Sequence, residues 1–340
     1  MQRKFDGQVV IVSGSSGGLG LAYAKFLASN GASVLLNGTT DRVSFAAAEI
    51  AGCGGQVRGF KADVGSLESC RQLVREAVDR WGRVDVVINN AGNEPNQFER
   101  SIEGLDASDL ESAFRVNVGG TYNLTLAVWA QMRKQGGGRI LNVASGHMFG
   151  SYGDFGLIPH AIAKSAIVGL TKAFACAGRL SRIRVNAIFP AALDTNSNRG
   201  SWDLSPEDLA EMASLAPADM VSPVVAALVD SSSAITGEMF SSCNQNVTRV
   251  FIGDTSGHNY LEYASVESCL QACLREPAYE IPTSIGEFFG RHLAPESMDR
   301  LSLLQQRHRR PQPAQMHCRE SRATGLSTDS SMSIQKSLDL

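Results

Sequence analysis

The sequence predicts an α/β fold of three layers, in which helices cover both faces of a parallel sheet of about seven strands. Up to about residue 245, short runs rich in β-branched residues alternate with longer segments of helical period. A glycine-rich turn separates the first such run from the first helical segment. With 340 residues, 43% of them apolar, the chain is long enough to bury a sizeable core within a single domain.

Each expected strand is followed by a helical or irregular segment. The strands are expected at 9–13, 33–36, 57–61, 84–88, 139–143, 184–188 and 238–241. The helices are expected at 18–30, 41–51, 66–81, 108–134 and 159–178. A further strand at 247–252 and short helices at 263–275 and 283–292 follow. We therefore expect one domain over 5–255 and a C-terminal appendage over 256–299.

From about residue 300 the composition changes to Gln, Arg, Ser and Pro, with few apolar residues. Such a segment cannot bury enough surface to offset its ordering entropy, so residues 300–340 are expected to be disordered. Seven basic and three acidic residues give this tail a charge of 7 − 3 = +4, on a chain whose total is −3. It is expected either to be solvated or to bind a partner or an anionic surface.

The overall charge gives no general attraction for nucleic acid. No stretch approaches the roughly 18 to 20 apolar residues of a membrane helix, and the start of the chain lacks a signal peptide, so a cytoplasmic location is expected. The seven cysteines show no CxxC spacing and are interpreted as reduced thiols. Cys269 and Cys273, one helical turn apart, are expected to be packing positions, and no metal site is expected.

The glycine-rich turn runs from Ser13 to Gly20 with the spacing G-x-x-x-G-x-G, at Gly14, Gly18 and Gly20. Glycines let the backbone turn sharply and approach a pyrophosphate, whose charge is met by free N–H groups at the start of the helix. Because the turn lies between a strand and a helix, it indicates a dinucleotide site more strongly than a glycine-rich run alone.

The end of the second strand predicts which dinucleotide fits. An acidic residue there would bind the ribose hydroxyls of NAD and repel a 2′-phosphate, but the expected position is Gly38. Thr39 and Thr40 can donate to phosphate oxygens and Arg42 can supply charge, so NADP is favoured, with NAD as the alternative. Asp41 is the complication, because it can simply cap the following helix.

These residues, together with Asn89-Asn90-Ala91-Gly92 after the fourth strand, resemble the short-chain dehydrogenase/reductase family over about residues 5–255. The resemblance implies a single Rossmann-type domain, a nicotinamide cofactor and a homodimer or homotetramer formed through the long helices. It implies that Asn90, Ala91 and Gly92 support the sheet beside the cofactor. The other cofactor-binding residues it implies are Gly14, Ser16, Gly18, Leu19, Gly20, Thr39, Arg42, Asp63 and Val64 (at the adenine), Lys164, Pro190 and Thr195.

Within the family, several segments resemble the dehydrogenase domains of peroxisomal multifunctional β-oxidation proteins, which act on 3-hydroxyacyl-CoA. They are 5–7, 18–24, 152–156 and 221–226. This resemblance implies a thioester substrate by analogy, and a peroxisomal location as an alternative to the cytoplasm.

The family's catalytic residues match Asn117, Ser145 and Lys164. The resemblance implies that the carbonyl of Asn117 holds a water that relays protons to the lysine. Ser145 would hydrogen-bond the substrate oxygen. Lys164 would bind the nicotinamide ribose and lower the pKa of a tyrosine four residues earlier.

In this chain the position of that tyrosine is occupied by His160. A histidine exchanges protons near neutral pH, but its far nitrogen reaches roughly 2 Å less than a phenol oxygen. The ammonium of Lys164 is expected to push His160 towards its neutral form. Tyr152, Asp154 and His147 are further candidates for the missing acid.

The sequence therefore supports three hypotheses about the function of the chain. The first is an NADP(H)-dependent oxidoreductase that acts on a ketone, an alcohol or a 3-oxoacyl or 3-hydroxyacyl substrate, with His160 as its acid and base. The second is a dehydratase, isomerase or cyclase on the same scaffold, which the missing tyrosine supports. The third is a catalytically silent NADP-binding protein.

Overall fold

The structure is a computed structural model. It describes residues 4–51, 56–93, 101–150, 157–190, 205, 207, 210–211, 214, 216–243, 245–255 and 258–282. Contacts within the chain divide it into two units, 1–285 and 286–340, of which the second lies outside the described residues. The predicted helix at 283–292 and the predicted disorder of 300–340 therefore also lie outside them.

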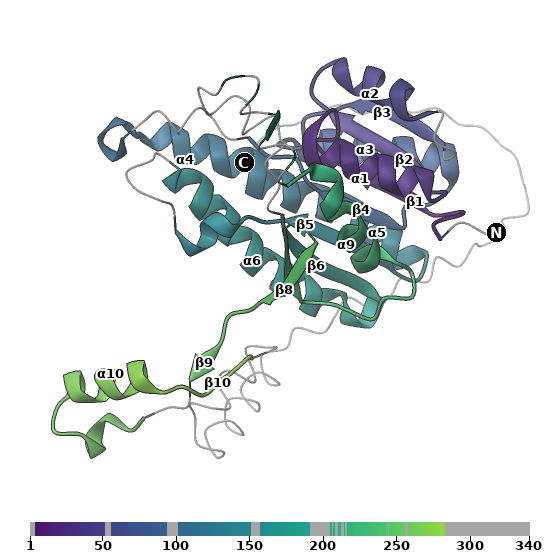
Figure 1. The fold of residues 1–340 in the computed structure, drawn as a ribbon. Helices are drawn as coiled ribbons and strands as arrows, with labels where there is room; N and C mark the ends of the chain where they lie inside the picture. Colours follow the sequence, from purple (N-terminus) through teal and green to yellow (C-terminus); the bar gives the residue numbers. More distant parts are fainter. Residues whose placement is uncertain are drawn as a thin grey trace, which may run out of the picture. The chain divides into compact units, whose positions relative to one another are not determined.

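A central sheet of eight strands carries the fold (Figure 1), in the order β3-β2-β1-β4-β5-β6-β7-β8. All seven strands expected from the sequence are present and parallel to one another. Their bounds are β1 Val9–Val12, β2 Ser33–Gly38, β3 Val57–Lys61, β4 Val86–Asn89, β5 Gly138–Val143, β6 Ile183–Pro190 and β7 Met239–Cys243. The central strands are buried on both faces, which explains why they read as apolar runs.

An eighth strand, β8 (Asn246–Val250), adds to the seven parallel strands that were expected. It follows β7 after a tight turn in which Gln245 takes a left-handed conformation with φ of 69°. It pairs antiparallel with β7, from Cys243 opposite Asn246 to Met239 opposite Val250. The strand expected at 247–252 therefore extends the edge of the main sheet, and Val250 is buried in the core.

Helices cover both faces of the sheet (Figure 1). On one face lie α1 (Gly18–Ser29), α2 (Arg42–Ile50) and α9 (Ser222–Val229), and on the other α3 (Leu67–Trp81), α5 (Thr121–Lys134) and α6 (Ile158–Gly178). In β1, alternate residues enter the two cores: Val10 packs with the first set and Ile11 with the second. The predicted three-layer architecture is confirmed.

The helix expected at 108–134 is present and unbroken, but its hydrogen-bond pattern changes in the middle. It consists of α4 (Ala107–Ala113), a π-helical segment Phe114–Gly120 and α5. Asp106 caps α4 in a capping box with Asp109. A π-helical turn widens the helix locally, which the periodicity of the sequence does not reveal. This turn contains Asn117, so the irregularity lies at a predicted site residue.

One helical stretch among the described residues, Ile158–Ser181, is long and apolar enough by length and composition to cross a membrane. It comprises α6 and a short 3₁₀ turn, Arg179–Ser181. Nine residues of α6 are buried in the fold, where it packs against β6. Packing in the core accounts for part of the apolar composition of this helix.

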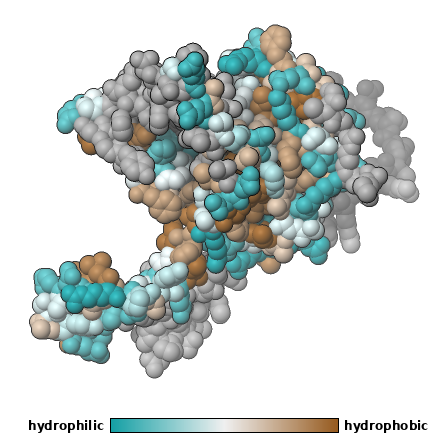
Figure 2. Space-filling view, in the orientation of Figure 1, coloured by the Kyte–Doolittle hydropathy of each residue, from teal (hydrophilic) through white to brown (hydrophobic). Residues whose placement is uncertain are grey.

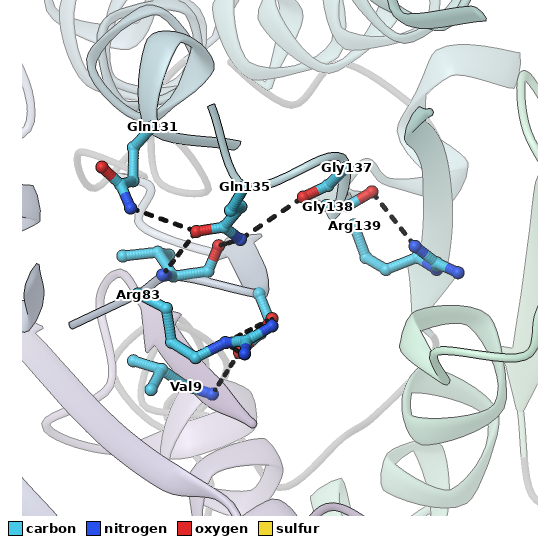
Figure 3. A network of polar contacts seen from close by, with 9 residues as sticks. Val9, Arg83, Gln131, Gln135, Gly137, Gly138 and Arg139 are labelled. Carbon is cyan, nitrogen blue, oxygen red and sulfur yellow. Dashed lines mark hydrogen bonds and ion pairs between the residues drawn. The ribbon is translucent and has the colours of Figure 1, made fainter. Parts of the chain in front are cut away.

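A polar network closes the amino-terminal edge of the sheet (Figure 3). Arg83 donates both Nε and Nη2 to the carboxylate of Asp85, which also accepts from the main-chain N–H of Val9. Gln135 donates to the carbonyls of Val84 and Gly137. The network connects loops at the amino ends of the strands. In folds of this kind, ligands bind at the opposite end, where the carboxyl ends of the strands lie. We interpret it as structural.

Beyond β8, the described chain continues as a short segment with two strands and one α-helix. Strands β9 (Asp254–Thr255) and β10 (Tyr279–Glu280) pair antiparallel, and α10 (Val266–Arg275) confirms the helix expected at 263–275. Its surface mixes hydrophobic and hydrophilic residues (Figure 2), with Leu270 and Leu274 exposed. Cys269 and Cys273 are free thiols on α10, and the described residues contain no cluster that could hold a metal ion.

Candidate active site

The turn between β1 and α1 is shaped by its glycines. Gly14 and Gly18 have φ values of 62° and 53°, in the left-handed region that favours glycine. A Cβ on Gly14 would lie 2.7 Å from the Cα of Ala91, and one on Gly20 would lie 2.5 Å from the carbonyl oxygen of Gly14. Side chains do not fit at these positions, so the glycines let the turn pack closely against the segment after β4 and against the start of α1.

The residues after β4 hold this turn in place. The side-chain amide of Asn90 donates to the carbonyls of Ser13 and Gly14, each at 3.0 Å. The hydroxyl of Ser13 accepts from the main-chain N–H groups of Asn90 and Ala91. One residue earlier, Asn89 donates to Asn142 on β5. These contacts explain how the Asn-Asn-Ala-Gly segment supports the carboxyl end of the sheet.

The first turn of α1 fits an anionic group. Its N-cap residue is Gly17, no side chain caps its N–H groups, and it contains no acidic residue. Uncapped N–H groups and the positive end of the helix dipole favour a phosphate at this place. The residues present therefore fit the pyrophosphate of a dinucleotide.

At the end of β2, Gly38 faces the same turn. A Cβ there would lie 3.3 Å from the hydroxyl oxygen of Ser16. Arg42 and Thr39 are exposed beside it. Asp41 takes the N-cap position of α2, but its side chain does not cap the helix; its carboxylate pairs with Lys61 at 3.0 Å. The simple capping role considered for Asp41 is therefore wrong.

Asp63, after β3, is bound to a neighbouring element. Its carboxylate accepts from the N–H of Gly65 and from the Nη1 of Arg115, at 2.8 and 2.7 Å. The guanidinium of Arg115 holds the pKa of Asp63 below its usual range. Val64 packs against Gly120, where a Cβ would come within 2.6 Å of it. Both predicted adenine-side residues thus also anchor the π-helical segment to the sheet.

Asn117 and Lys164 converge on one point. The amide of Asn117 donates to the carbonyls of Asn93 and Ala113, while its Oδ1 is buried with no hydrogen bond from a described residue. Lys164 is buried too, and its Nζ donates to the carbonyl of Val143 at 2.9 Å. A Cβ on Gly92 would lie 2.6 Å from that Oδ1 and 3.7 Å from the Nζ of Lys164.

Ser145 lies two residues after the end of β5 and is the N-cap of a 3₁₀ turn, Gly146–Phe149. Its hydroxyl accepts from the main-chain N–H of His147, and its Oγ lies 2.9 Å from the Nδ1 of the His147 ring. Ser145 and His147 are both partly exposed. The serine and the imidazole therefore form a hydrogen-bonded pair that solvent partly reaches.

His160 lies in the first turn of α6 and is only 2% exposed. Its ring stands edge-on to that of His147, with the centroids 5.3 Å apart. Burial first, and then the charges of Lys164 and His147, lower the pKa of His160 to about 3. The predicted shift towards the neutral form is confirmed in direction. A neutral imidazole whose pKa lies this low is a poor proton donor and a weak base at neutral pH.

One of the remaining predicted residues lies at the end of β6, and three lie in segments that the structure does not describe. Pro190 ends β6 and pairs with Ser242 on β7. Thr195, Tyr152 and Asp154 lie outside the described residues.

Sequence reasoning considered His147 only among several substitutes for the missing acid. The signal in the sequence is a serine at the end of a strand followed by glycine and then histidine. A tight turn after the serine brings the side chain two residues on back to its hydroxyl.

The fold and the site define a dinucleotide-binding protein of the Rossmann type. A family model described as short chain dehydrogenase matches residues 8–204, which is more than half of the chain. The chain belongs to the short-chain dehydrogenase family.

Similar proteins agree with this assignment. The mouse protein "Peroxisomal multifunctional enzyme type 2" is 37% identical over 250 residues, covering 70% of this chain and 32% of that protein. The "7alpha-hydroxysteroid dehydrogenase" of Bacteroides fragilis is 30% identical over 193 residues, covering 56% of this chain and 74% of that protein. The chain thus spans about a third of the length of the mouse protein.

Solved structures resemble the fold as well. A 7α-hydroxysteroid dehydrogenase in complex with NADH and 7-oxo glycochenodeoxycholic acid superposes with a TM-score of 0.61 at 25% identity, covering 71% of this chain and 95% of that one. A mutant short-chain dehydrogenase/reductase of Serratia marcescens also gives 0.61, at 30% identity, covering 70% of this chain and 97% of that one.

Proposed function

We propose that the chain is an NADP(H)-dependent oxidoreductase that interconverts a ketone or 3-oxoacyl thioester with the corresponding alcohol. The observation that carries this proposal is the convergence of Asn117 and Lys164 at Gly92. Lys164 donates to the carbonyl of Val143, two residues before Ser145. When bound, the nicotinamide supplies or accepts the hydride. The similarity to a peroxisomal multifunctional enzyme and to 7α-hydroxysteroid dehydrogenases supports a hydroxyacyl or steroid-like alcohol as substrate.

In this proposal each side chain has a separate task. The hydroxyl of Ser145 holds the substrate oxygen, and Lys164 holds the nicotinamide ribose. The buried side-chain oxygen Oδ1 of Asn117 suits a water that connects Lys164 with solvent, because it lies beside Gly92 near that ammonium and accepts no hydrogen bond from a described residue. His160 takes the place of the usual tyrosine. Its burial keeps the imidazole neutral, so that it lines the site without exchanging a proton.

The direct test is the oxidation of NADPH by the purified protein with acetoacetyl-CoA, 7-oxo bile acids and activated diketones. We expect turnover with at least one of these carbonyl compounds and binding of NADPH without substrate. Binding of NADPH with no turnover across the panel, together with activity in His160→Tyr alone, would point to the non-redox or silent readings instead.

A substitution at the end of β2 tests the preference for NADP. Gly38→Asp places a carboxylate beside Ser16 and Arg42, where it repels a 2′-phosphate and accepts from ribose hydroxyls. We expect the Kd for NADPH to rise about tenfold, which is about 1.4 kcal/mol, while the Kd for NADH stays equal or falls. Fluorescence titration measures both. Arg42→Ala is the companion variant: it should weaken NADPH alone, and equal weakening of both cofactors would contradict the assignment.

We also propose that the chain forms a homodimer or homotetramer through α5 and α6. Tyr122 on α5 contacts Phe174 on α6, with ring centroids 5.8 Å apart, so the two helices lie side by side. Large apolar side chains are exposed on these helices and on the segment that precedes α5. They are Leu110, Phe114, Tyr122, Leu126, Ile158 and Ile162. Exposed apolar residues in this number are typical of a contact surface.

The substitution Leu126→Arg tests this surface. Leu126 is 38% exposed on α5, and a buried arginine without a partner would disfavour association. We expect wild type to be oligomeric and Leu126→Arg to shift to monomer by light scattering at micromolar concentration. Phe45→Arg is the control, because Phe45 is 75% exposed on α2, away from these helices. A monomeric wild type would refute the proposal.

We also propose a cytoplasmic location for this chain. Two of its relatives are named as peroxisomal.

A further inference from the structure

The pair formed by Ser145 and His147 offers a route for a proton that the proposed assignment of His160 does not use. The Oγ of Ser145 lies 2.9 Å from the Nδ1 of His147, which is hydrogen-bonding distance. The 3₁₀ turn fixes this contact from the backbone as well, because Ser145 accepts the N–H of His147. The imidazole is therefore connected to the atom that is proposed to hold the substrate oxygen.

The two histidines of the site lie in different surroundings. His147 is partly exposed on the turn after β5, whereas His160 is almost completely buried on α6. Their rings meet edge to face at 5.3 Å with an angle of 85° between the planes. An exposed imidazole can exchange protons with water, and a buried neutral one cannot do so readily. His160 also packs against His147 and limits the positions that its ring can take.

We propose that His147 relays the proton of the reaction through Ser145, and that His160 is a positioning residue that holds the His147 ring. This inference rests on the proposed oxidoreductase function and deepens it. It differs from the expectation that His160 itself takes the place of the catalytic tyrosine.

In the direction of reduction, the carbonyl carbon would accept the hydride that a bound reduced nicotinamide dinucleotide supplies, and the C=O π electrons would become a lone pair on an alkoxide oxygen. The Ser145 hydroxyl gives its proton to that oxygen, and its Oγ takes the Nδ1 proton of a protonated His147. His147 becomes neutral and regains a proton from water. Oxidation of the alcohol runs through the same bonds in reverse.

The first arm of the test measures turnover with matched variants. His147→Ala should lower kcat by about 100-fold or more, as expected for loss of a general acid, while the Kd for NADPH stays within about twofold. His160→Ala should cost less, about tenfold, because it only loosens the His147 ring. His258→Gln is the control outside the site; His258 bonds to Tyr263 in the segment after β8.

Rescue by a small molecule separates a relay from a structural role. Added imidazole should restore part of the activity of His147→Ala, because the vacated place is open to solvent. It should not restore His160→Ala, whose place is buried. Full activity in His147→Ala, or rescue of His160→Ala alone, would overturn the inference in favour of His160.

The second arm needs no turnover and keeps the two proposals distinguishable. The chain has six histidines, so the ring nitrogens can be assigned by NMR with the variants above. Ser145→Ala should shift the Nδ1 resonance of His147 and leave that of His258 unchanged. If wild type reduces no carbonyl but this shift is present, the oxidoreductase proposal fails while the pair remains. If the shift is absent, the relay is refuted whatever the activity.

Discussion

Lys164→Met is expected to lower the kcat of carbonyl reduction by at least about 100-fold while the fold is retained. The Nζ of Lys164 is anchored on the carbonyl of Val143 and lies close to Asn117 beside Gly92. Methionine keeps much of the length and apolar character of the stem but removes the charge that positions the nicotinamide ribose in the proposed site. Steady-state kinetics with NADPH measures the loss.

The same variant has a second, independent readout at His160. Lys164 contributes to the low pKa of His160 of about 3, although burial contributes more. Removing the ammonium should therefore raise the pKa of His160 while burial keeps it below its ordinary value. An NMR titration of wild type and Lys164→Met compares the two. Lys172→Met, two turns further along α6, is the matched control and should change neither kcat nor this titration; an unchanged His160 titration in Lys164→Met would show that the two groups are not coupled.

Gly20→Ala is expected to have the largest effect on cofactor binding. The added Cβ would lie 2.5 Å from both the Nδ2 of Asn90 and the carbonyl oxygen of Gly14. Because Asn90 holds the turn through that same carbonyl, the methyl group must separate the turn from its support. We expect the Kd for NADPH to rise by about 100-fold, and an overpacking cost of about 1–3 kcal/mol in the free energy of unfolding.

A matched change elsewhere isolates this effect. Gly169→Ala lies on α6, where a Cβ would meet nothing within 4 Å. It should leave the Kd for NADPH unchanged and the protein as stable as wild type or slightly more so, by about 0.5–1 kcal/mol, because alanine favours a helix over glycine. Fluorescence titration and urea unfolding measure both variants. Equal NADPH affinity in Gly20→Ala and wild type would falsify the assignment of this turn to the cofactor.

Much of the site was predictable because its signals are local in the chain. The glycines of the turn, the Asn-Asn-Ala-Gly segment and the spacing of His160 and Lys164 lie within short stretches. The structure brings them together at the carboxyl end of the sheet because parallel strands align those ends. The roles of these residues remain predictions, whereas their proximity, for Asn90 and Gly14 or for Asn117 and Lys164, is seen in the structure.

Other features could not be predicted because they depend on contacts between distant segments. The π-helical turn at Asn117 interrupts a regular periodicity, and the pairing of β8 with β7 depends on a single tight turn. Asp41 suited a capping position in the sequence, but Lys61, brought close on the neighbouring strand, attracts its carboxylate instead. Such choices are decided by small energy differences that the local sequence does not reveal.

For this protein, the sequence by itself determined the α/β class, the places of the parallel strands along the chain and the place of the phosphate turn. Hydrophobic periodicity and glycine conformation are properties of neighbouring residues, and they needed no tertiary contact. Only the tertiary structure decided the state of the two histidines. The end of β5 and the start of α6 meet in space, so that His160 is buried beside Lys164 and His147 stays open to water and bonded to Ser145. Burial and neighbouring charge set proton affinity, and both arise from segments far apart in the chain.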